Sequence, residues 1–136
     1  MSGLFSSLGV AGSGMSVYKT WIDATADNVA NTNTVKPTSE AAYQAKNVVA
    51  ASVPGGANAV GQGAQVTQIL LSDREGTVVY APDHPLADQQ GMVRYPSMNM
   101  TDQMTNLIIA QRAYQANVTV FERARDAYLR ALEIGR

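Results

Sequence analysis

The two ends of the chain carry the same heptad spacing of apolar residues, with positions that alternate four and three residues apart. This spacing draws one apolar seam along one side of a helix, as in coiled coils. The pattern therefore predicts two long terminal helices that pack as an antiparallel pair. The seam side chains expected to make contacts are Leu4, Leu8, Met15, Tyr18, Ile22 and Val29 in the first helix, and Leu107, Tyr114, Val118, Phe121, Tyr128 and Leu132 in the second, where Gln111 and Arg125 also fall on the seam.

The first helix is predicted from residue 1 to about residue 31, where asparagines and then Pro37 end it. Three interior glycines weaken it, each by roughly 1 kcal/mol relative to alanine. The second helix is predicted to start near Thr101, whose side chain could cap it, and to run to about Ile134. At about 1.5 Å per residue it would be about 50 Å long. We expect part of its apolar surface to contact another chain, because one partner helix and a small insert cannot cover it.

The middle of the chain has β-leaning runs at 42–51 and 64–71, separated by a stretch rich in glycine. These runs predict a hairpin with a long loop. A short strand is possible at 78–80, and prolines make 82–96 look like loop. The expected fold is mainly α: an antiparallel pair of long terminal helices with a small β-hairpin insert. The expected domains are 1–35 with 101–136 for the helices, and 36–100 for the insert.

Composition narrows the range of functions. The 136 residues suffice for one domain, and ten basic residues against eleven acidic ones give a net charge of −1. A nucleic-acid partner is not expected, because the basic surplus typical of such proteins is missing. No apolar run approaches the roughly 20 residues of a membrane span, and the N-terminus does not resemble a secretory signal. We therefore expect no membrane insertion, and export, if it occurs, without a cleaved signal.

Candidate chemistry is sparse. The chain has no cysteine, which excludes thiolate nucleophiles and ligands, and its only histidine is His84. A metal site or a catalytic role would need further ligands or a nucleophile nearby, and the neighbouring sequence supplies none. The sequence favours a structural loop histidine, and it predicts no enzyme activity, no catalytic residue, no metal and no cofactor.

Residues 23–34 resemble an "NNxANxxT" signature, with Asn28, Asn31 and Thr34 at matching positions. This signature is found near the N-terminus of the bacterial flagellar basal-body rod protein family, and two further segments also resemble that family. Residues 80–96 resemble a "Y-x-P-x-H-P-x-A-D-x-x-G-x-V-x-x-P" segment of a short subunit of the proximal rod. The matching residues there include His84, Pro85, Asp88 and Gly91, and a C-terminal "R-x-Y-Q-A-N" motif is matched by Gln115 and Asn117. A Glu-Met pair common in the family appears here as Gln103-Met104.

The resemblance implies a structural subunit that is exported unfolded by the flagellar type III apparatus. Such subunits polymerise through their terminal helices into the periplasmic rod, a tube that transmits torque. The implied partners are other rod subunits, further copies of the same chain, the adaptor that links the rod to the membrane ring, and the export machinery. Two alternatives stay open: another short rod subunit, and a helical export substrate or adaptor that binds partners without polymerising.

Overall fold

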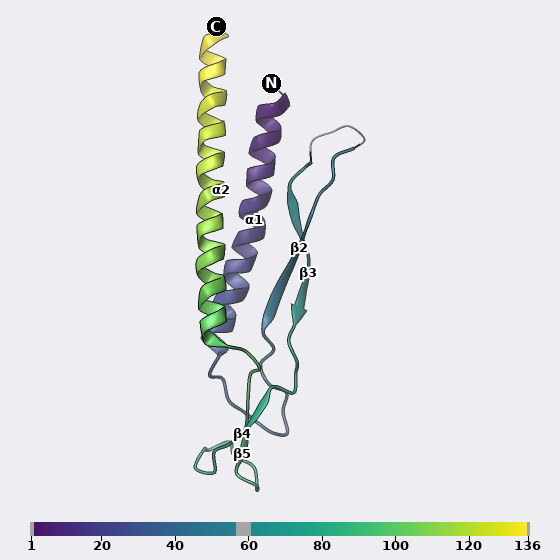
Figure 1. Ribbon diagram of the computed structural model, residues 1–136, viewed down its shortest axis with the longest axis vertical. Coiled ribbons are helices and arrows are strands. Elements are labelled where there is room, and N and C mark those ends of the chain that lie inside the picture. Colours follow the sequence, from purple (N-terminus) through teal and green to yellow (C-terminus); the bar gives the residue numbers. More distant parts are fainter. Residues whose placement is uncertain (1, 57–60, 136) are drawn as a thin grey trace. The chain divides into compact units, whose positions relative to one another are not determined.

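The computed structural model describes residues 2–56 and 61–135, the side chains of Ser2 and Leu4 excepted (Figure 1). Its contacts group these residues into two compact units. Unit 1 comprises residues 2–22, 49–56, 61–68 and 108–135, and unit 2 comprises 23–48 and 69–107. The elements in chain order are α1 (Ser2–Asn31), β1 (Lys36–Pro37), β2 (Lys46–Ser52), β3 (Ala64–Leu71), β4 (Thr77–Tyr80), β5 (Met92–Tyr95) and α2 (Met100–Ile134).

Both predicted helices are present, and their ends have identifiable causes. At the end of α1, the Asn31 side chain donates to the carbonyl of Asp27 at 2.9 Å, so it caps the last turn. At the start of α2, the side-chain oxygen of Asn99 accepts from the N–H of Thr101 at 2.8 Å and from that of Asp102 at 3.4 Å. The cap is therefore Asn99, and the prediction of Thr101 was wrong. Asn99 lies just before the first helical turn, from where its side chain reaches the free N–H groups.

Unit 1 contains the N-terminal part of α1 beside the C-terminal part of α2, running in opposite directions (Figure 1). The rings of Phe5 and Tyr128 meet edge to face with centroids 4.9 Å apart. Further along, Gly14 lies so close to Asn117 that a Cβ there would be 2.6 Å from the amide oxygen. A glycine that weakens the isolated helix is thus the residue that lets the two helices approach.

The runs at 42–51 and 64–71 predicted a hairpin, and β2 and β3 pair as a two-stranded sheet. Residues 49–52 of β2 and 64–68 of β3 belong to unit 1. Ser13 joins this hairpin to α1, because its hydroxyl accepts from the N–H of Ala64 at 3.0 Å and donates to the carbonyl of Val10 at 2.7 Å. One side chain therefore fixes a turn of the helix to the start of a strand.

Unit 2 contains a three-stranded antiparallel sheet with the strand order β1–β5–β4. Val93 of β5 pairs with Pro37 on one side and with Val79 on the other, and it is fully buried, at 0% exposure. The central strand β5 therefore supplies the buried apolar side chain of this sheet, Val93.

The prediction of a mainly α chain with a single small hairpin was wrong, because residues 2–56 and 61–135 contain five strands in two antiparallel sheets. The segment 82–96 looked like loop because of its prolines. However, Pro82 and Pro85 lie in the turn between β4 and β5, and Pro96 follows the end of β5. With only four residues, β5 is too short to show the alternation that marks a strand. The predicted division into 1–35 with 101–136 and 36–100 stays a prediction.

Candidate functional site

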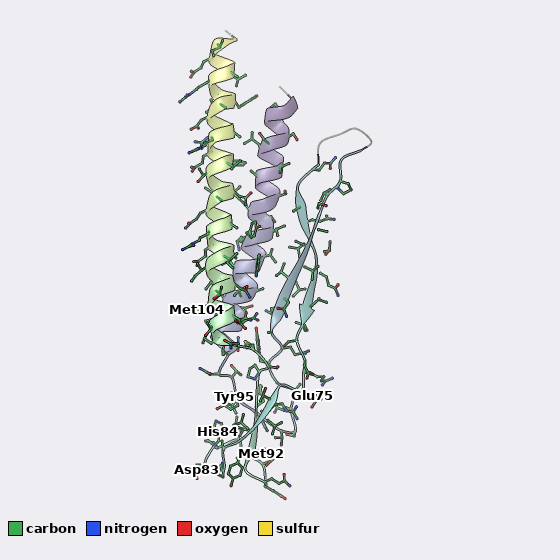
Figure 2. All side chains as sticks on the ribbon, in the orientation of Figure 1. Glu75, Asp83, His84, Met92, Tyr95 and Met104 are labelled. Atoms are coloured by element: carbon green, nitrogen blue, oxygen red, sulfur yellow. The ribbon has the colours of Figure 1, made fainter. Side chains whose placement is uncertain are left out.

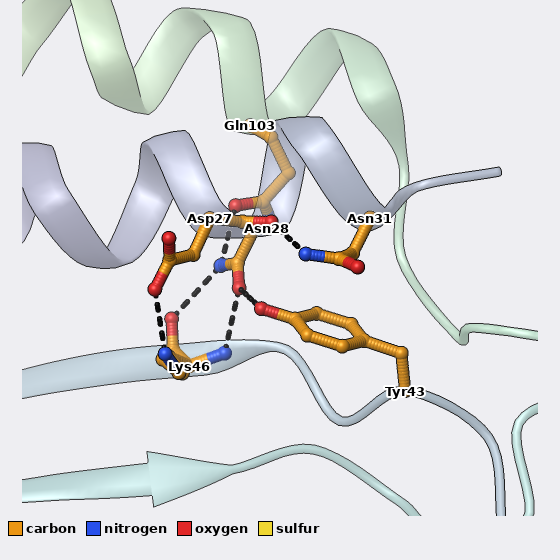
Figure 3. A network of polar contacts seen from close by, with 6 residues as sticks. All are labelled: Asp27, Asn28, Asn31, Tyr43, Lys46 and Gln103. Atoms are coloured by element: carbon orange, nitrogen blue, oxygen red, sulfur yellow. Dashed lines mark hydrogen bonds and ion pairs between the residues drawn. The ribbon is translucent and has the colours of Figure 1, made fainter. Parts of the chain in front are cut away.

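Asn28, from the N-terminal motif, is the centre of a polar network in unit 2 (Figure 3). Its amide nitrogen donates to the carbonyl of Lys46 and to the side-chain oxygen of Gln103, both at 2.9 Å. Its amide oxygen accepts from the N–H of Lys46 at 2.8 Å and from the hydroxyl of Tyr43 at 3.3 Å. Asn28 is only 1% exposed, and these four bonds use its full donor and acceptor capacity.

The Asn28 amide bonds both to the C=O and to the N–H of Lys46, as the backbone of a neighbouring strand would. These two hydrogen bonds satisfy both backbone groups that β2 presents at this point on the edge away from β3, so that edge is closed there. The third partner, Gln103, belongs to α2 and is itself 9% exposed. One side chain therefore joins α1, α2 and β2 within unit 2.

Ionisable groups surround this network. Lys46 Nζ lies 2.6 Å from a carboxylate oxygen of Asp27, and this hydrogen bond and charge raise the pKa of the lysine. Partial burial raises the pKa of Tyr43, so its hydroxyl stays a donor to Asn28. The raised pKa values keep Lys46 charged and the Tyr43 hydroxyl protonated at neutral pH.

Asp88, from the second motif, organises the turn between β4 and β5. Its carboxylate accepts from the N–H groups of Met92 and Gln90, both at 2.9 Å, and from the hydroxyl of Thr38 at 2.7 Å. The bonds from Met92 and Thr38 lower the pKa of Asp88. Gly91 completes the turn with φ of +75°, a conformation that L side chains rarely adopt. These motif residues therefore shape the backbone.

His84 lies in the same turn, next to Asp83 (Figure 2). The imidazole Nδ1 of His84 accepts from the backbone N–H of Leu86 at 3.1 Å, and the backbone N–H of His84 donates to the carbonyl of Ala81 at 3.0 Å. Pro85 and Leu86 beside it are exposed. Within residues 2–56 and 61–135, no group of three histidine or acidic side chains could hold a metal ion. In the same residues, no helix is long and apolar enough to cross a membrane.

The third motif lies in the helix pair of unit 1. Asn117 is half-buried opposite Gly14 and donates to the carbonyl of Ala113 at 2.8 Å. Gln115 is exposed on α2. Thr34, from the first motif, donates to the side-chain oxygen of Asn31 at 3.1 Å just after α1.

The predicted seam side chains are mostly half-buried between helices. The half-buried ones are Leu8, Met15, Tyr18, Ile22, Tyr114, Val118, Phe121 and Tyr128 in unit 1 and Val29 and Leu107 in unit 2. Leu132 is exposed, and the side chain of Leu4 lies outside the described residues. On α2 the predicted seam positions Gln111 and Arg125 are exposed, whereas Ala110 is fully buried. The two helices approach most closely at small residues, so on α2 the buried position is Ala110 and not the predicted Gln111.

Large apolar side chains remain exposed on other faces of both units. In unit 1, Ile109 and Val120 of α2 are 48% and 52% exposed. In unit 2, exposed apolar residues gather on two strands: Ile69, Leu70 and Leu71 of β3, and Val78, Val79 and Tyr80 of β4. Surfaces of this kind usually mark contacts with other proteins.

Sequence reasoning missed several partners of the motif residues. Tyr43, Lys46 and Gln103 surround Asn28, and Thr38 binds Asp88. Only Gln103 carried a signal, because it replaces a glutamate that is common in the family. The others lie in the segment between the motifs, where nothing in the sequence pattern marked them.

Comparisons with known proteins agree with the motifs. Residues 89–134 match the family described as "Flagellar basal body rod FlgEFG protein C-terminal". A flagellar basal-body rod protein FlgC of Yersinia enterocolitica is 36% identical over 129 residues, which cover 93% of this chain and 94% of the relative. The FlgC proteins of Salmonella typhimurium and Borreliella burgdorferi are 32% and 30% identical, and the alignments cover 93% and 97% of this chain and 94% and 97% of those relatives.

Proposed function

Because the chain belongs to the FlgC family of flagellar basal-body rod proteins, it is a structural subunit of the rod, and we propose that it polymerises there through its terminal helices. The observation that carries this proposal is the apolar surface of α2 in unit 1. Ile109 and Val120 are half-exposed although α1 already packs on α2. Eleven residues make just over three turns of an α-helix, so the two side chains lie on nearly the same line of the helix.

Burial of such side chains against a neighbour supplies the free energy of assembly. Each large apolar side chain contributes roughly 1.5–3 kcal/mol when fully buried, and about half of that remains available for a half-exposed one. Leu129 and Leu132 are also exposed near the end of α2, on the side of the helix that carries the predicted seam, so they offer a second apolar surface there. The predicted seam residues then hold the helix pair together, and Leu132 meets a neighbouring subunit.

The chain assembles with other components of the flagellar basal body. We propose that these are other rod subunits, further copies of this chain and the adaptor at the membrane ring. We also propose that the type III machinery exports the chain without signal cleavage, and that the assembled rod transmits torque across the periplasm. Catalytic activity is not part of this proposal, because membership of a structural family gives no reason to expect it.

The two alternatives are less favoured. The relatives that match nearly the whole chain carry the name FlgC, which speaks against a different short rod subunit. A non-polymerising adaptor would leave the apolar surface of α2 without a partner. The proposal can therefore be tested on that surface.

The test is the pair of changes Ile109→Asp and Val120→Asp, made together in a strain that lacks the native gene. Electron microscopy of basal bodies is expected to show no complete rod, and the cells are expected to lack hooks. Thr119→Asp is the control for each single change, because it adds one carboxylate at an exposed position next to Val120. Normal rods with the double variant, at normal protein levels, would show that this surface does not drive assembly.

A further inference from the structure

The outer edge of β4 is open in unit 2. β4 is the terminal strand of its sheet, and only β5 pairs with it. Ala81 donates its N–H to the carbonyl of Gly91 at 2.8 Å, directly after the paired residues Tyr80 and Met92. In an antiparallel pair, residues that bond to the partner strand alternate with residues that point away. The N–H and C=O groups of Val78 and Tyr80 therefore face outward, and none of them has a partner among the described residues.

Nothing on β4 protects this edge. Its four residues, Thr77–Tyr80, have high β-propensity and carry no charge or proline, and all are exposed. Tyr80 is 68% exposed. Soluble proteins usually protect such edges with charge, proline or a covering segment, because an open apolar edge is a template for another strand. β2 has this protection at Lys46, where Asn28 binds both backbone groups, and β4 does not.

The C-terminal end of β3 has a matching property. Ile69, Leu70 and Leu71 are three consecutive apolar residues, and Leu71 is 57% exposed. A continuous apolar run is typical of a strand that is covered on both faces and paired on both sides. Ser72, the next residue, donates to the carbonyl of Ala45, so it faces β2. By alternation, Ile69 and Leu71 present their backbone groups at the edge away from β2.

We propose that β4 of one copy adds to the free edge of β3 of the next copy. The two sheets then form one five-stranded sheet across the subunit contact, with the order β1–β5–β4–β3–β2. Both apolar runs become internal strands, and neither brings a charge to the contact. This inference rests on the proposed self-association and names a second surface for it.

The direction of the contact fits an open polymer. A β4–β4 contact would be two-fold symmetric and would stop at a dimer, whereas a β4–β3 contact uses different surfaces on the two copies. Contacts of this second kind continue into a helical filament when the rotation does not close. We therefore assign β3 of a second copy as the occupant of the β4 edge.

The first experiment uses proline, which removes a backbone donor. Val78→Pro removes an outward N–H and no bond within the chain, a position where edge strands accept proline. Val79→Pro removes an inward N–H opposite Val93. Val78→Pro is expected to leave the thermal midpoint close to that of the unchanged chain but to abolish rods and motility. Val79→Pro is expected to lower the midpoint by several degrees.

Val78→Lys tests the same edge without a change in the backbone, in case the proline disturbs folding. Leu86→Lys is its control, because Leu86 is a similarly exposed apolar residue in the turn after β4. Loss of rods with Val78→Lys but not with Leu86→Lys supports the proposal. Normal rods with both Val78→Pro and Val78→Lys overturn it, while self-association through the helices would still stand.

The second experiment identifies which strand occupies the β4 edge. Because the chain has no native cysteine, only the introduced cysteines can form a cross-link between copies. Val78→Cys and Ile69→Cys are produced in two differently tagged copies in the same cells, and isolated basal bodies are oxidised. A cross-link between the two tagged copies, with none when either variant is produced alone, is the expected result. A cross-link with Val78→Cys alone would indicate a β4–β4 contact and overturn the assignment. The assignment would also be overturned if Val78→Cys formed no cross-link with Ile69→Cys and none with Leu71→Cys.

Discussion

Replacement of Asn28 by alanine is the most informative single change in unit 2. The change removes four hydrogen bonds: two with the backbone of Lys46, at 2.9 and 2.8 Å, one with Gln103 at 2.9 Å and one with Tyr43 at 3.3 Å. Three of these are short, and each contributes about 1 kcal/mol net. The longer bond from Tyr43 contributes less, because the hydroxyl can turn to water.

A penalty for the partners adds to this loss. Gln103 is 9% exposed, so its side-chain oxygen cannot be fully hydrated once the amide is gone. A buried polar group without a partner costs about 1–3 kcal/mol. Lys46 is less buried, and water can replace part of its lost bonds. Three bonds and this penalty together give about 4–6 kcal/mol, and hydration of Lys46 offsets about 1 kcal/mol, so the expected loss in the free energy of unfolding is about 3–5 kcal/mol.

Urea unfolding of the purified full chain, followed by circular dichroism, measures this loss. With an m-value of about 2 kcal/mol/M, the midpoint should fall by about 1.5–2.5 M. Asn31→Ala is the matched control, because this asparagine is three residues further along α1 and makes only local bonds. Its midpoint should fall by about 0.5 M or less. An Asn28→Ala midpoint no lower than that of Asn31→Ala would refute the claim that this amide holds unit 2 together.

Three further changes test the helix contact, the turn and the histidine. Gly14→Val should lower the free energy of unfolding by about 1–3 kcal/mol, because the added side chain would overlap Asn117. Gly12→Ala should raise it by up to about 1 kcal/mol, because an added Cβ there would meet no atom within 4 Å. Equal unfolding midpoints for the two variants would contradict the close approach of Gly14 to Asn117. Asp88→Asn should destabilise the chain at pH 7 and progressively less in acid. Because the pKa of Asp88 is lowered in the folded chain, its stabilising effect is present above the ordinary pKa of 3.8 and is lost as the pH falls through the lower folded pKa. A difference in unfolding free energy between variant and unchanged chain that stayed constant down to about pH 2 would contradict this. His84→Ala should cost about 1 kcal/mol in thermal unfolding, through one lost acceptor, and leave swimming in soft agar nearly unchanged; a folded but non-motile variant would argue for a direct role.

The terminal helices could be predicted because their signal is long and periodic. The spacing repeats over many turns, so the extents of α1 and α2 were predicted to within one or two residues. The innermost residues were harder to predict. Ala110 and Gly14 carry little hydrophobic signal, yet the contact is closest at small residues. A pattern weighted toward large apolar side chains therefore placed the seam of α2 at Gln111.

The second sheet could not be predicted for a different reason. Its pairs join residues that are far apart in the sequence, such as Lys36 with Arg94, and each strand has at most four residues. The partners of Asn28 and Asp88 are also distant, so the motifs identified the central residues but not their contacts. Exposed apolar strands such as β4 look like core strands in the sequence, and only the structure shows that their edge is open.

The Asn28 amide also determines how unit 2 can open. Its bonds connect α1 to β2 and to α2, so departure of α1 leaves unpaired polar groups on both other segments, and departure of β2 or α2 leaves them on the buried Asn28. Partial opening is therefore costly, and unit 2 should exchange its protected amide hydrogens in one cooperative event. The glycine-containing start of α1 is joined to the hairpin by the Ser13 hydroxyl, which accepts one hydrogen bond from Ala64, whereas the Asn28 amide makes four. A chain drawn through a narrow channel from its N-terminus would meet its main mechanical resistance only when the pull reaches Asn28.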